Sequence, residues 1–276
     1  MLSRPIRLSK AYMGQAYAFM TVYRGELFLW MIATSLPIIM MGIWVEAGES
    51  GAFPGFGPVD AARYFIAVFI VRQFTVCWVI YDFEYQVVTG KLSSRLMHPA
   101  DPAWYFVTNH LADQAIRAPF CIGLLALCFV IQPQALWGDA STGGEYGWWT
   151  PSLQQVGAAV VATYTAFALR FLMQYTLAML AFWHERVAAA DAVLMVPYTF
   201  LSGLVIPLQL LPEPLDQWVF YTPFPYMVWW PATLLAGGEA GFLQPLLVVS
   251  GWLVGLYALN RLVWWRGLKH YSAMGA

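Results

Sequence analysis

The chain contains six apolar stretches, each close to the about 20 residues that an α-helix needs to cross a bilayer. Inside the hydrocarbon core a backbone finds no water, so such a stretch crosses as a helix that satisfies its own hydrogen bonds. With 60% hydrophobic and 11% charged residues, the sequence is too apolar for a water-soluble domain. It predicts an all-α, polytopic membrane protein, with residues 1–276 forming a single transmembrane domain. The six predicted transmembrane helices are 27–45, 61–81, 103–131, 156–183, 188–210 and 245–265.

The charges in the connections separate by sign if six helices alternate across the membrane. Ten of the fourteen Lys and Arg residues then fall on one side, namely Arg4, Arg7, Lys10, Arg24, Lys91, Arg95, Arg186, Arg261, Arg266 and Lys269. The other side carries Arg63 at its edge and the acidic residues Glu46, Glu49, Asp60, Asp139, Glu145, Glu213, Asp216 and Glu239. Lys and Arg stay in the cytoplasm, so both termini are predicted to be cytoplasmic.

Two segments outside these crossings have a membrane-associated pattern. Residues 4–25 place apolar side chains on one helical face and polar ones on the other, which favours an amphipathic helix in the inner interface over a disordered tail. Residues 211–244 are apolar and aromatic, contain five prolines and lack Lys and Arg. We expect two re-entrant helices that dip into the outer leaflet, because Trp and Tyr prefer the membrane boundary. The alternative is an ordinary extracellular loop.

A short polar segment, 83–99, connects the second and third predicted crossings. Gly90 suits the end of the preceding helix, because glycine accepts a left-handed conformation. Leu92 and Leu96 lie four residues apart on one helical face with basic residues beside them, and Pro99 ends the helix. Such a helix either rests on lipid headgroups or docks into a groove of a cytoplasmic protein.

Three arginines, Arg72, Arg117 and Arg170, lie away from the ends of the predicted crossings, where a charge is costly and marks a functional or a paired position. Arg117 has Asp113 four residues before it, and the spacing predicts an ion pair on one helix. Arg72 and Arg170 have no acidic residue within a turn of their own helices. They are the candidates for a translocation path, and the alternatives are scaffold contacts to carbonyls or contacts to lipid phosphate.

Motifs of enzymes are missing from the chain. It has no GxxxxGK[ST] phosphate loop, no HExxH, no GxSxG and no cluster of Cys with His. We therefore predict no catalytic residue, no metal site, no cofactor and no nucleic-acid partner.

Five further stretches carry a resemblance to a known family: YRGELFLW at 23–30, GKLSSRLMHP at 90–99, LSGLVIPLQLLPEPL at 201–215, TPFPYMVWWPATLLAG at 222–237 and RGLKHYSAMGA at 266–276. They resemble the permease subunits of ABC transporters, specifically the ABC type-2 exporter permeases and their viologen-exporter-like subfamily. Relatives of this kind move drugs, polysaccharides, lipids or antibiotics, so the resemblance names a class and no substrate.

The resemblance implies a complex of two permeases, alike or paralogous, with two separate ABC ATPases that bind the ATP. It also implies a bacterial cytoplasmic (inner) membrane and contact with membrane lipid. Residues 83–99 would then form the cytoplasmic coupling loop that receives the motion of the ATPases. The residues assigned to coupling are Glu84, Gly90, Lys91, Leu92, Arg95, Leu96, His98 and Pro99.

Two other functions remain open at the level of sequence. A membrane enzyme acting on lipid could use the prolines and tryptophans of 212–231, and activity without any ATPase would reveal it. A channel or stand-alone secondary transporter would work alone in liposomes. For a permease, an anionic substrate would suit Arg72 and Arg170, whereas the aromatic content of 17% would suit a cation or a flat drug.

Overall fold

The computed structural model describes residues 3–22, 25, 29–30, 32, 34–51, 53, 55–138, 148–238 and 240–271. Within these ranges every regular element is a helix. Four helical stretches are long and apolar enough to cross a membrane, namely Pro58–Val88, Ala103–Ile131, Leu153–Phe182 and Leu243–His270. The chain is therefore an all-helical, multi-pass membrane protein. A count of six crossings stays a prediction.

The first predicted crossing, 27–45, is only partly visible, because residues 27–28, 31 and 33 lie outside the described residues. Its second half falls in α3 (Leu36–Glu49), which has Pro37 in its first turn, where the missing proline N–H costs no helical hydrogen bond. α3 packs along α4 (Pro58–Thr75).

The second predicted crossing is two helices, α4 and α5 (Val79–Val88), rather than one continuous rod. A third helix, α7 (Ala103–Ile131), satisfies the backbone groups left open between them. The N–H of Trp78 donates to Nε2 of His110 at 2.9 Å, and Nε2 of Gln114 donates to the carbonyl of Phe74 at 2.8 Å. His110 Nδ1 lies 2.7 Å from the Phe106 carbonyl, and with the proton on Nδ1 the ring donates there and accepts from Trp78. Two backbone groups at the break are thus hydrogen-bonded to side chains of α7.

The fifth predicted crossing, 188–210, ends early as a helix. α10 (Ala188–Leu201) stops because Gly203 adopts a φ of +85°, which a helix does not allow. The carbonyl of Ser202 then accepts the N–H of Trp229 at 2.8 Å, and the chain continues irregularly to the 3₁₀ turn η2 (Leu208–Leu210).

Before α13 begins at Leu243, the described residues of the segment 211–244 form short helices. They are α11 (Leu215–Trp218), η3 (Val219–Tyr221), η4 (Phe224–Met227) and α12 (Trp229–Ala236). α12 packs against α4 and α9 (Leu153–Ala178), and it ends at Gly237 with a φ of +90°. Its Trp230 is fully buried, and the indole N–H donates to the carbonyl of Gly241 at 3.1 Å. The entry of this segment into the outer leaflet stays a prediction.

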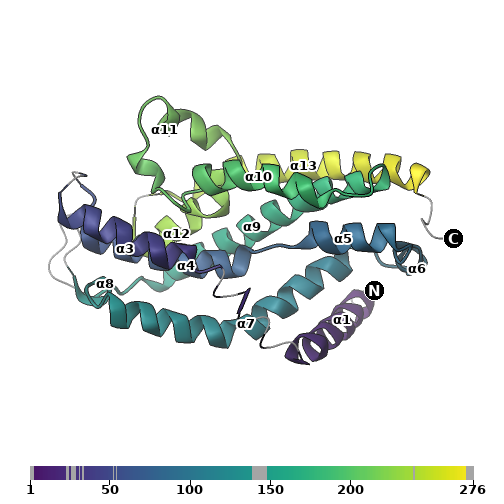
Figure 1. Cartoon of the computed structure of the whole chain (residues 1–276), viewed down its shortest axis with the longest axis horizontal. Helices are drawn as coiled ribbons and strands as arrows, with labels where there is room; N and C mark the ends of the chain where they lie inside the picture. Colours follow the sequence, from purple (N-terminus) through teal and green to yellow (C-terminus); the bar gives the residue numbers. More distant parts are fainter. Residues whose placement is uncertain are drawn as a thin grey trace.

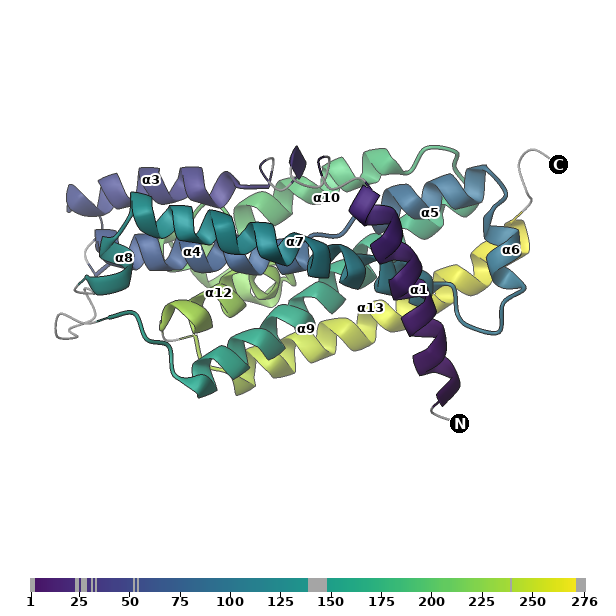
Figure 2. The same ribbon diagram turned by 90° about the horizontal axis from the view of Figure 1, so that it is seen from below.

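The long helices run side by side, whereas α1 (Ser3–Val22) crosses over them (Figures 1 and 2). The ring of Tyr12 on α1 meets Tyr105 on α7 edge-on, with 5.8 Å between ring centres. A crossing direction of this kind suits a helix that lies in the membrane plane, as predicted for 4–25. α8 (Gln134–Trp137) follows α7 at the far end of the molecule from α6 (Leu92–Leu96), and α13 (Leu243–His270) is the last helix.

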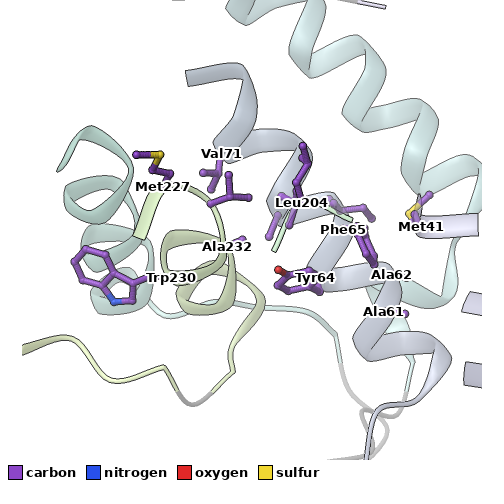
Figure 3. Close-up of a cluster of buried hydrophobic side chains, with 14 of the residues drawn as sticks. Met41, Ala61, Ala62, Tyr64, Phe65, Val71, Leu204, Met227, Trp230 and Ala232 are labelled. Carbon is purple, nitrogen blue, oxygen red and sulfur yellow. The ribbon is translucent and has the colours of Figure 1, made fainter. Parts of the chain in front are cut away.

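The buried apolar side chains form two separate clusters. The first lies around α4 and α12 and includes Tyr64, Phe65, Met227 and Trp230 (Figure 3). The second lies around α5, the start of α7 and the ends of α9 and α13, with Phe83, Phe106, Tyr175 and Trp264 among its members.

Candidate functional site

The predicted coupling segment contains the short helix α6 at one end of the molecule (Figure 1). Gly90, just before it, has a φ of +72°, the left-handed conformation that only glycine adopts at little cost. Leu92 is fully buried in the second apolar cluster, so it faces the protein's own core. Leu96 and Met97 are 36% and 83% exposed, and they form the apolar tip of the segment. The exposed ridge is therefore Leu96 with Met97, while Leu92 anchors the helix.

The basic residues of this segment also contact the body of the protein. Nε of Arg95 donates to Oε1 of Gln86 at 2.6 Å, and the guanidinium carbon lies 3.2 Å from the centre of the Tyr105 ring. Nζ of Lys91 donates to the Tyr85 hydroxyl at 2.7 Å. These contacts hold α6 against α5 and α7. His98 and Pro99 are exposed beyond the helix.

Glu84 joins α5 to the beginning of α10. Its Oε2 accepts the N–H groups of Val187 and Ala188, each at 2.6 Å. Both N–H groups belong to the first turn of a helix, where they have no partner within the helix and where a negative charge is favourable. The sequence placed Glu84 in the coupling loop, and the structure shows which contact it makes.

A cavity of about 380 Å³ lies between α4, α5, α9 and α10, and it brings Arg72 and Arg170 together. Its lining residues are Thr34, Arg72, Val76, Trp78, Tyr81, Arg170, Asp191, Ala192 and Met195. The two arginines come from helices that are far apart in the sequence, so their common site could not be read from spacing.

The two arginines differ in their partners. Nη1 of Arg170 donates to the Tyr198 hydroxyl at 2.7 Å, and its guanidinium carbon lies 4.2 Å from the centre of that ring. Arg72 is different: its Nε and Nη1 are buried and make no hydrogen bond in the part of the chain that the structure describes.

Asp191 is a site residue that the sequence reasoning missed. It is 3% exposed on α10, and its Oδ1 accepts from Nε2 of Gln174 at 2.8 Å. An acidic residue inside a predicted crossing is itself a signal for a paired or functional position, so the stretch 188–210 did contain the information. Another prediction is confirmed: Arg117 and Asp113 form a buried ion pair on α7.

One comparison with known proteins gives a match. Residues 149–275, just under half of the chain, match the model of the family described as ABC-2 family transporter protein. This stretch contains α9, α10, α12 and α13. No curated protein matches the chain. Together with the helices long enough to cross a membrane, the match supports an ABC type-2 permease, in general a non-catalytic membrane component whose partner is an ABC ATPase.

Proposed function

We propose that the chain is the permease subunit of an ATP-driven exporter in a bacterial cytoplasmic membrane, with both termini in the cytoplasm. It forms the translocation path for an amphipathic substrate and is driven by separate ATPase subunits. The observation that carries the coupling proposal is the tip of α6. Leu96 and Met97 are exposed at the end of the molecule, on a helix that Leu92 and Arg95 hold against the body. An exposed apolar ridge on a rigid helix fits a groove on a partner.

A chain of contacts leads from this tip to the cavity. α6 is bound to α5 through Arg95 and Gln86, and α5 is bound to the first turn of α10 through Glu84. α10 in turn carries Asp191 and Met195, which line the cavity. Movement of the ATPases then shifts α5 and α10 together and changes the cavity between an inward and an outward state. A substrate biases that change only through different affinities for the two states.

The exposed apolar surface of α13 is the proposed contact with lipid or with a second permease, alike or paralogous. Leu247 and Val254 are 65% and 71% exposed there. The similarity to viologen exporters stays a prediction that rests on the five motifs at 23–30, 90–99, 201–215, 222–237 and 266–276, which do not identify a cargo.

The experiment is a pull-down of the tagged full chain from membranes of its native host, with mass spectrometry of the proteins recovered. We expect an ATPase with Walker motifs to co-purify with the wild type. Leu96→Glu combined with Met97→Glu should reduce its recovery at least about tenfold, because the charges prevent burial of the ridge in a groove.

The matched control is Leu153→Glu. Leu153 is 89% exposed at the start of α9, where a negative charge is tolerated, so ATPase recovery should not change. The proposal fails if the wild type recovers no such ATPase, or if the double variant recovers as much as the control.

A further inference from the structure

We propose that the cavity between α4, α5, α9 and α10 binds the anionic group of an amphipathic substrate, with Arg72 as the residue that holds the charge. The inference rests on the proposed translocation function and deepens it, since it names the substrate class. It also decides between the anion and the cation that the sequence left open.

The lining of the cavity carries more positive than negative charge. Arg72 and Arg170 are its cations and Asp191 is its single acid, which leaves one positive charge in excess. The charges of Arg170 and Asp191 interact, so these two residues compensate each other. Arg72 instead has Arg170 and the Tyr198 hydroxyl as its electrostatic neighbours. The excess charge is therefore that of Arg72.

The Arg72 side chain is charged and has buried donors without an acceptor in the described part of the chain. A guanidinium does not lose its proton in proteins, so Arg72 keeps its charge in the cavity. Its Nε and Nη1 are buried without an acceptor among the residues that the structure describes. Buried donors on a charged group are costly without a partner. A carboxylate, sulfonate or phosphate supplies acceptor oxygens that suit a guanidinium, and such a group can reach Nε through the fork with Nη2, or Nη1 through the end-on fork with Nη2.

The other side chains of the lining are mostly apolar. Val76, Trp78, Ala192 and Met195 surround the charged groups, and the volume of about 380 Å³ falls within the range of small-molecule sites. An anion with an apolar body therefore fits the cavity. A cation could stack on Trp78 but would lie beside two arginines, and the repulsion disfavours it.

The experiment measures binding to the full chain alone, in nanodiscs of zwitterionic lipid, with three fluorescent probes of one shape. They are dansyl-aminoundecanoic acid, its primary amide and its trimethylammonium analogue. Empty nanodiscs give the lipid background. We expect saturable binding of the carboxylate probe, at least about tenfold tighter than the amide and tighter still than the cation.

Arg72→Gln should remove this preference for the carboxylate, and Arg72→Lys should restore part of it. The control is Arg63→Gln on the same helix α4, because Arg63 donates to the carbonyls of Ala135 and Gly138 away from the cavity. Circular dichroism and size-exclusion profiles of each variant check that it is folded. An anionic lipid headgroup and a free amphipath share this chemistry, so a second set of nanodiscs contains phosphatidylglycerol. Competition that depends on Arg72 assigns the site to lipid, and unchanged probe affinity assigns it to a free amphipath.

Equal affinity for the three probes, tighter binding of the cation, or a carboxylate preference that survives in folded Arg72→Gln would overturn the inference. None of these results bears on the coupling to an ATPase, which the pull-down tests separately. A failure of this inference can therefore be distinguished from a failure of the proposed function.

Discussion

Glu84 is a side chain that links the coupling segment to the beginning of α10, the helix that carries Asp191 and Met195 of the cavity. One carboxylate oxygen accepts two N–H groups from the connection between α9 and α10, about a hundred positions away in the sequence. Hydrogen bonds to charged groups contribute more than neutral ones, so this contact is both strong and directional.

Glu84→Ala should lower the free energy of unfolding by about 2 kcal/mol, or roughly 4–8 °C in Tm, because two N–H groups in the first turn of α10 lose their acceptor. Thermal unfolding of the purified chain in detergent measures the shift. In the reconstituted complex, we also expect substrate to stimulate ATP hydrolysis less than in the wild type.

The comparison variant is Glu185→Ala, in the same connection and exposed. It should shift Tm by less than about 1 °C, as surface substitutions usually do. Equal shifts in both variants would show that the Glu84 contact contributes no special stability.

Contacts between residues close in the sequence were easier to predict than contacts between residues far apart in the sequence. Asp113 and Arg117 lie one helical turn apart, and their pair could be predicted from the sequence. Glu84 and Asp191 act on partners brought close only by packing, 103 and 17 positions away. For Arg72 the sequence showed a charge that needs an explanation, while the cavity around it depends on how α9 and α10 pack.

Among the helices, α13 shows how small residues set the packing distance. Gly267 faces the 3₁₀ turn η1 (Met179–Phe182), and a side chain there would overlap the ring of Phe182, itself buried against Phe83 and Trp264. Gly255, on the same helix, has open space beside it.

Gly267→Ala should destabilise the protein by about 1–3 kcal/mol, because the buried ring has no room to yield. Gly255→Ala should be neutral or stabilise by up to about 1 kcal/mol, because alanine favours the helix. Thermal unfolding of both variants in one detergent measures the difference. A result in which the two variants behave alike would contradict the close contact between α13 and η1.

The lengths of the apolar stretches predicted the positions of the long helices well, but they predicted the ends of the helices less well. The regions 103–131 and 245–265 fall within α7 and α13, since long apolar stretches leave the backbone little choice. No proline or glycine marks the break between α4 and α5 in the sequence. The residues that hydrogen-bond to the backbone there, His110 and Gln114, are on α7, so the break could not be predicted locally. The early end of α10 does follow from its glycine.

In the complete molecule, the segregation of charge predicts a topology that labelling can test. α6 and the end of α3 lie at opposite ends of the long helices (Figure 1). Met97→Cys and Glu49→Cys place an exposed thiol at each end, and the three natural cysteines are buried. In intact spheroplasts, a membrane-impermeant maleimide should label position 49 and should reach position 97 only after permeabilisation.

The reverse labelling pattern would place α6 outside the cell and would end the coupling proposal. Labelling of both positions from one side would contradict the single crossing, 61–81, that is predicted between them. Wild-type protein gives the background from Cys77, Cys121 and Cys128.

The two apolar clusters meet near the break between α4 and α5. Val71 belongs to the first cluster and Cys77 to the second, and along α9 Leu169 belongs to the first whereas Phe167 and Phe171, on either side of it, belong to the second. The two clusters therefore border each other along α9, and the cavity of Arg72 lies beside this border, between α4, α5, α9 and α10. Under the proposed coupling, a tilt of α5 and α10 relative to α4 would change the shape of this cavity, so a small movement would act on the cargo where the two clusters meet.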